Sequence, residues 1–169
     1  KGNKVDEHQG GHSKNYDAIL LGYNHIGLNF METLKKMKKK FIIVDYNPEV
    51  INELMEKQIP CLYEDVEDDD IFERINIKKV KLVVSSIKSI DTNLPLIRSI
   101  REENKKCVII LVSDKIEEAI EYYQAGANYV IIPNEVGGSH ASTLLEKFGL
   151  DAKEFLPLQI KHLEKLNKI

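Results

Sequence analysis

Residues 18–27 read AILLGYNHIG, an apolar run that leads directly into two glycines with four residues between them. Ala18–Leu21 is typical of a short buried strand, and Gly22–Gly27 stands where a G-x-G-x-x-G turn joins the first strand of a dinucleotide-binding unit to its first helix. Asn24 replaces the middle glycine. We expect Asn24 to tolerate the positive φ of such a turn while its side chain fills space that a phosphate would use.

The same alternation of strand and helix continues along the chain. Apolar runs without polar alternation predict strands covered on both faces, as in a parallel sheet, at Ala18–Leu21, Phe41–Val44, Cys61–Tyr63, Val80–Val84, Val108–Val112 and Tyr129–Ile132. Between them the apolar residues follow a helical period, with N-caps expected at Asn47 (before Pro48), Asp114 and Asn134. The predicted fold is α/β, a doubly wound Rossmann-type parallel sheet of six strands with a C-terminal helical extension.

This alternation also predicts three segments. Residues 1–15 hold a single aliphatic side chain, Val5, and are expected to form a linker or tail. Residues 16–148 carry the Rossmann-type domain, and residues 149–169 form one amphipathic helix. No stretch is apolar for long enough to cross a bilayer.

Composition narrows the classes of function. Lys and Arg number 24 against 27 Asp and Glu, a net charge of −3, so neither a nucleic-acid partner nor a broad basic face for anionic lipid is expected. The lysine-rich run at residues 35–40 is isolated in the sequence and is interpreted as a solvated helix end. Cys61 and Cys107 lie in apolar runs, which indicates buried thiols in a reducing compartment.

An acidic residue stands where the second strand ends. Asp45 follows Gly22 by 23 residues, the position from which a carboxylate hydrogen-bonds ribose hydroxyls and disfavours a 2′-phosphate. The spacing therefore favours NAD(H) or an adenine nucleotide over NADP(H). In the alternative interpretation, the glycines serve only packing and Asp45 only caps the following helix.

Five motifs occur in a fixed order: G-Y-x-x-I-G (22–27), V-D-Y-N-P-E (44–49), Y-E-D-V (63–66), D-T-N-L (91–94) and A-G-A-N-Y-V-I-I-P (125–133). In this order they resemble the nucleotide-binding regulatory domains of potassium transport, called RCK, KTN or TrkA-N domains. The resemblance covers about residues 16–148. The segment P-N-E-V-G-G-S-H-A-S (133–142) is most similar to the cytosolic domain of Kef-type cation:proton antiporters.

The resemblance implies a site and partners. The ligand would be NAD(H) or AMP, ADP or ATP. Its binding residues would face the phosphates (Gly22, Asn24, His25, Ile26), the ribose (Asp45), the adenine edge (Asp65, Val66) and the second half of the ligand (Ser85, Ser86). Gly27 and Tyr46 would belong to the same cofactor-binding site. It also implies a homodimer whose hinge responds to nucleotide and gates a membrane-embedded cation transporter from the cytoplasmic side. A regulatory domain of a potassium channel is the alternative.

No catalytic arrangement is visible in the sequence. The chain has no G-x-S-x-G or H-E-x-x-H motif and no second domain to hold a substrate against a nicotinamide, so we expect a non-catalytic domain. A small NAD-dependent oxidoreductase, or its cofactor domain, is the further alternative. The acidic run at residues 64–70 is interpreted without a metal, since acidic residues are also favoured where a helix begins. The histidines at positions 8 and 12 are interpreted as part of the solvated tail.

Overall fold

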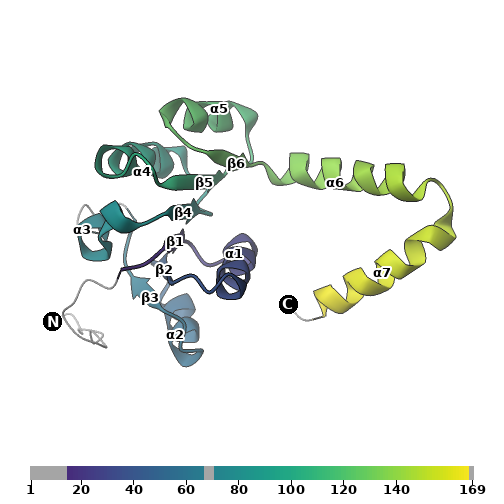
Figure 1. The fold of residues 1–169 in the computed structure, drawn as a ribbon, viewed down its shortest axis with the longest axis horizontal. Helices are drawn as coiled ribbons and strands as arrows, with labels where there is room; N and C mark the ends of the chain where they lie inside the picture. Colours follow the sequence, from purple (N-terminus) through teal and green to yellow (C-terminus); the bar gives the residue numbers. More distant parts are fainter. Residues whose placement is uncertain (1–14, 67–70, 168–169) are drawn as a thin grey trace. The chain divides into compact units, whose positions relative to one another are not determined.

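The computed structural model describes residues 15–66 and 71–167. Its elements in chain order are β1 (Ala18–Leu21), α1 (His25–Lys36), β2 (Phe41–Asp45), α2 (Pro48–Glu56), β3 (Cys61–Tyr63), α3 (Ile71–Ile75), η1 (Ile77–Lys79), β4 (Leu82–Ser85), α4 (Ile90–Glu103), β5 (Val108–Val112), α5 (Ile116–Ala125), β6 (Tyr129–Ile131), α6 (Pro133–Phe148) and α7 (Ala152–Leu166). The strands form one sheet in the order β3-β2-β1-β4-β5-β6, with every adjacent pair parallel (Figure 1). This confirms the predicted doubly wound sheet, and its topological switch point lies between β1 and β4.

Apolar side chains fill both faces of the sheet. All four residues of β1 are at most 1% exposed. Ala18 and Leu20 belong to a core that includes Met31 and Leu34 of α1 and Leu54 of α2. Alternate residues of a strand point to opposite faces, so the burial of Ile19 and Leu21 requires a second covered face. The strands are therefore continuously hydrophobic because both faces of the sheet are buried.

Several element ends differ from the predicted ones. β4 begins at Leu82 rather than Val80, because the Val80 N–H donates to Ile77 O and closes the turn of η1 before the strand starts. Asn47 caps α2 as predicted, its side chain accepting from the Glu49 N–H at 2.9 Å. The N-caps expected at Asp114 and Asn134 were wrong: α5 begins after Lys115, and Asn134 lies inside α6.

The described residues divide into two compact units, one up to Ile131 and one from Ile132. The second unit consists of α6 and α7, and in neither helix is a described residue buried. Gly137 and Gly138 do not interrupt α6, which runs without a break through both. The predicted tail lies almost entirely outside the described residues, and the predicted boundary after residue 148 falls at the turn between α6 and α7. None of the described helices has both the length and the apolar character that a bilayer crossing requires.

Candidate functional site

The turn after β1 depends on a glycine at position 22. Gly22 has a φ of +84°, a conformation that residues with a Cβ rarely adopt. A Cβ at this position would also lie 2.6 Å from Ser86 Oγ. At the other end of the turn, a Cβ on Gly27 would lie 2.7 Å from Gly22 O, so Gly27 lets α1 approach the strand closely. The two glycines thus perform the first and third roles of the dinucleotide-binding turn.

Asn24 is the N-cap of α1. Its φ of −126° is extended, so the turn does not use the tolerance of positive φ that was expected of this residue. The side chain instead turns back over the helix end, where Oδ1 accepts from the Ile26 N–H at 3.0 Å and from the Gly27 N–H at 3.1 Å. These are the amide groups that a helix N-terminus offers to a phosphate. In this structure the side chain of Asn24 satisfies both.

Asp45, at the end of β2, is tied to the glycine turn. Its Oδ2 accepts from the Tyr23 N–H at 2.9 Å and its Oδ1 accepts from the Asn47 N–H at 2.8 Å. An ionised carboxylate has about four lone-pair sites, so each oxygen keeps capacity for one more donor. Asp45 therefore joins the loop after β1 to the loop after β2, and its carboxylate retains acceptors that a ribose hydroxyl would use.

Ser85 and Ser86 are buried at the switch point. The Ser85 hydroxyl donates to Asn93 Oδ1 at 2.9 Å, and the Ser86 hydroxyl lies 3.0 Å from Leu21 O and 3.2 Å from Gly22 O. Both hydroxyls are therefore engaged within the protein, and Ser86 holds the glycine turn against β4. Any contact of these serines with a ligand stays a prediction.

Asn93, for which the sequence predicted no role, anchors the buried end of β4. It is fully buried in α4, accepts from Ser85 and donates to Ile87 O at 2.7 Å and to Tyr122 Oη at 3.3 Å. Burial raises the pKa of Tyr122. The spacing of Asn93 in the sequence could have predicted these bonds. Asn93 shares the helical stripe of the buried Leu96, Ile97 and Ile100, where a polar residue must find internal partners.

The remaining predicted site residues lie at the same edge of the sheet. His25 is exposed at the first position of α1, and Ile26 is half-buried beside it. Tyr46 is 70% exposed after β2. Asp65 and Val66 follow β3, the outermost strand, so they are two strands away from β1.

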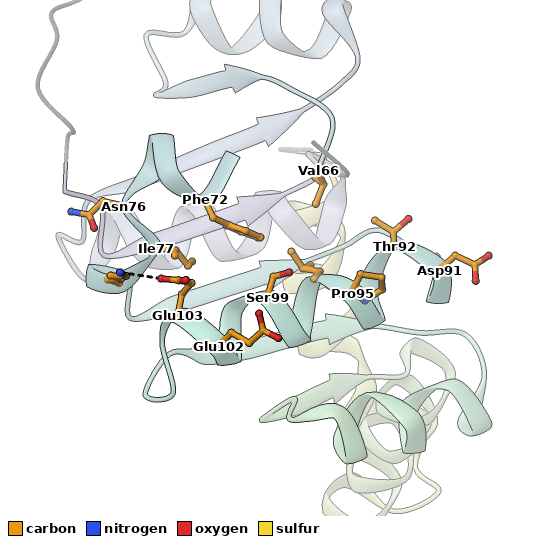
Figure 2. A pocket seen from close by; sticks show the side chains of 12 residues that line it. Val66, Phe72, Asn76, Ile77, Asp91, Thr92, Pro95, Ser99, Glu102 and Glu103 are labelled. Carbon is orange, nitrogen blue, oxygen red and sulfur yellow. Dashed lines mark ion pairs between the residues drawn. The ribbon is translucent and has the colours of Figure 1, made fainter. Parts of the chain in front are cut away.

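A cavity of about 800 Å³ lies between the α3–η1 segment and α4 (Figure 2). Its walls combine apolar side chains with charged groups, among them the Lys78–Glu103 ion pair at 3.2 Å, which Figure 2 marks with a dashed line. Of the predicted site residues only Val66 lines it. None of residues 22–27 lines this cavity, so it is separate from the phosphate position expected at the glycine turn.

Two lysines at the carboxyl edge of the sheet form ion pairs. Lys88 pairs with Asp114 at 2.8 Å, and Lys115 pairs with Glu118 at 2.8 Å. The Lys115 ammonium lowers the pKa of Glu118. Within residues 15–66 and 71–167, no three His, Cys, Asp or Glu side chains are grouped as metal ligands, and residues 67–70 of the predicted acidic run lie outside that part.

Comparisons with known proteins agree with this geometry. A family model described as the TrkA-N domain matches residues 18–133. Potassium channel protein 1 of Methanocaldococcus jannaschii is 29% identical over 126 residues, which are 73% of this chain and 38% of that protein. Probable potassium channel protein 2 of the same organism is 27% identical over 146 residues, 85% of this chain and 42% of that protein. The chain thus spans less than half the length of these relatives.

Solved structures share the fold at lower identity. The TrkA-N domain of the inner membrane protein ybaL from Escherichia coli has a TM-score of 0.70 at 20% identity, over 81% of this chain and 99% of that one. The Kef C-terminal domain of Shewanella denitrificans, in an AMP-bound form, has a TM-score of 0.66 at 16% identity, over 89% and 91%. The GsuK channel bound to NAD has a TM-score of 0.64 at 17% identity, over 76% and 24%.

Proposed function

The chain belongs to the TrkA-N domain family, and from this membership we propose that it is a nucleotide-sensing regulatory domain of a potassium transport system. The observation that carries the proposal is the link between the loop after β1, which lies at the switch point, and the loop after β2. Gly22 supplies the tight turn, and Asp45 bonds that turn through the Tyr23 N–H while keeping acceptors free. Ligands of doubly wound sheets bind at this position.

The proposed ligand is NAD(H) or an adenine nucleotide without a 2′-phosphate. Asp45 supports this choice, because a 2′-phosphate placed at the ribose would meet a carboxylate at close range. Structures with similar folds have been described with NAD, ADP and AMP. The adenine edge is assigned to Asp65 and Val66 by resemblance.

The side chain of Asn24 indicates that the domain binds the phosphates of its ligand weakly. A phosphate at the N-terminus of α1 must displace the Asn24 side chain from the Ile26 and Gly27 amides, or bind without them. The neighbouring His25 does not supply the permanent charge of an arginine. We therefore expect the adenosine end of the ligand to contribute most of the affinity.

Calorimetry tests the ligand class. The purified chain is titrated with NADH, NADPH, AMP, ADP and ATP under one buffer condition. We expect NADH or an adenine nucleotide to bind and NADPH to bind more weakly. Tighter binding of NADPH than of NADH, or no binding of any of the five, would overturn the proposal.

Assembly as a homodimer belongs to the same proposal. Large apolar side chains of the second unit are about half exposed, including Val136 and Leu145 on α6 and Leu156, Ile160 and Leu163 on α7. Twofold pairing with a second copy is the commonest way to bury such a surface. A ligand can shift such a dimer only through different affinities for two arrangements, which is the hinge that we propose.

Sedimentation and solution scattering test the assembly. We expect a dimer at micromolar concentration, a monomer for Ile160→Asp, and a dimer for the control Lys161→Asp at the adjacent exposed position. Saturating nucleotide should change the scattering curve of the dimer. A monomeric wild-type chain would refute the assembly, and an unchanged curve with nucleotide bound would refute the hinge.

The finer proposal is a Kef-type cation:proton antiporter, supported by the segment at residues 133–142 and by the Kef domain that matches 89% of this chain. A potassium channel is the second candidate, supported by the two curated relatives. The gene sequence upstream of Lys1 distinguishes them, since about a dozen hydrophobic spans indicate an antiporter and two indicate a channel. We propose no catalytic role, and consumption of bound NADH by the purified chain would contradict this.

A further inference from the structure

The connections that lead into the strands at the amino edge of the sheet are rich in lysine. Four of them, residues 37–40, 57–60, 76–81 and 104–107, precede β2, β3, β4 and β5. Together they contain nine lysines, all exposed, and no carboxylate. We call these lysines the basic edge.

The parallel topology brings these connections together. The Lys40 carbonyl accepts from Asp17 and Ala18 N–H, and the Lys81 carbonyl accepts from the Val108 N–H at 2.9 Å. Asn104 donates to Ile77 O at 2.8 Å and to Val80 O at 2.7 Å, which joins the connection before β5 to the connection before β4. In sequence the run at residues 35–40 is isolated, but in the fold it is one part of a continuous surface.

Few carboxylates balance this surface. Among the described residues, the carboxylates just before β1 and in the last turns of α2 and α4, which end at this edge, are Asp17, Glu53, Glu56, Glu102 and Glu103. Three of them form ion pairs, with Lys81, Lys57 and Lys78. The other six lysines of the basic edge form no ion pair within the described part of the chain. The chain's net charge of −3 conceals this surface because the carboxylates gather elsewhere, including at the opposite edge.

We propose that the basic edge rests on the anionic phospholipid headgroups of a membrane. This inference depends on the proposed function, which joins the domain to a membrane protein. The chain enters β1 at this same edge, where Asn15 contacts Asn76. The carboxyl edge with the nucleotide site then faces away from the membrane, open to the surrounding solution.

The chemistry of the basic edge favours lipid over nucleic acid. Its nine exposed cations are lysines, hydrated point charges that suit diffuse attraction to a phosphate surface, whereas base recognition favours bidentate arginine. The guanidinium of the neighbouring Arg101 donates to the carbonyls of Cys107 and Gly126. The four connections contain no aromatic side chain on which a base could stack. Met37, 57% exposed beside Lys38, adds an apolar side chain that can enter the headgroup region.

Vesicle sedimentation tests the proposal with the intact chain. The probes are vesicles of phosphatidylcholine with about 30% phosphatidylglycerol, vesicles of pure phosphatidylcholine, and a mixed-sequence DNA duplex, all near 0.1 M salt. We expect binding to the anionic vesicles only, and loss of that binding near 1 M salt, where charge interactions are screened within about 3 Å. Equal binding to pure phosphatidylcholine, or tighter binding to DNA than to anionic vesicles, would overturn the proposal.

Matched triple variants locate the surface. Lys38→Gln/Lys39→Gln/Lys40→Gln should weaken vesicle binding about a hundredfold. The control Lys153→Gln/Lys161→Gln/Lys165→Gln removes the same charge from α7, at exposed positions, and should change it by less than about threefold. An equal loss in both variants would overturn the assignment to the basic edge. Calorimetry with nucleotide on the same variants tests the proposed function separately, since no nucleotide contact is assigned to these lysines.

Discussion

Replacing Asn24 with glycine should tighten the binding of phosphate-bearing ligands while destabilising the free domain slightly. Asn24 Oδ1 occupies the Ile26 and Gly27 amides at 3.0 and 3.1 Å. Asn24→Gly frees both amides for a phosphate oxygen and removes the side chain from the space above them. The variant also restores the middle glycine of the dinucleotide-binding turn.

The expected magnitudes follow from these two contacts. A hydrogen bond to a charged group contributes about 1.5–3 kcal/mol, so recovering one net bond from the two amides should strengthen ADP or NADH binding about tenfold to a hundredfold. The stability cost is small. Glycine is itself an acceptable N-cap, at a cost of a few tenths of a kcal/mol, and its extra freedom in the unfolded chain adds about 0.4–1 kcal/mol.

Calorimetry with matched ligands and variants isolates the phosphate effect. Adenosine, which has no phosphate, should bind wild type and Asn24→Gly equally. Asn24→Asp keeps an acceptor at the helix end and adds a negative charge, so it should weaken ADP binding while stabilising α1 by about 0.3–1 kcal/mol. If Asn24→Gly binds ADP no more tightly than wild type while adenosine binding is unchanged, Asn24 contributes a contact to the ligand and the reasoning is refuted.

Three further predictions concern Asp45, Gly22 and Cys107 of the first unit. Asp45→Ala should weaken adenosine binding by about 1–3 kcal/mol through loss of a charge-assisted hydrogen bond. Calorimetry measures this against the exposed control Asp114→Ala, and an equal loss of adenosine affinity in both variants would contradict the ribose role. Gly22→Ala should lower the free energy of unfolding by about 1–3 kcal/mol because of the φ of +84° at Gly22 and the crowding at Ser86. Gly138→Ala, with open space around it inside α6, should raise the free energy of unfolding by about 0.5–1 kcal/mol. Urea titration measures both, and an unchanged free energy of unfolding in Gly22→Ala would show that the turn adapts. Burial raises the pKa of the Cys107 thiol to about 11 from 9.0. The unfolded chain therefore loses that proton first, and the free energy of unfolding should fall as pH rises from about 9 to 11. Cys107→Ala should flatten this part of the pH profile of the free energy of unfolding, and an unchanged slope would exclude Cys107 as its source.

The sequence by itself determined the architecture. Each strand is a continuous apolar run because both of its faces are buried. Such a run predicts a strand even when the neighbouring strands of the sheet are not known. The glycine turn was equally local, since the φ of Gly22 and the close approach of Gly27 follow from their places between a strand and a helix.

Contacts between distant segments were decided only by the tertiary structure. Side-chain direction made Asn24 the cap of α1. The bonds of Ser86 to Leu21 and of Asn93 to Tyr122 join segments far apart in the chain. The basic edge is the clearest case. Its lysines stand in four separate runs, and net charge averages them with the carboxylates of the opposite edge. Only the parallel order of the strands places all four runs side by side, because every connection into a parallel strand arrives at the same edge of the sheet.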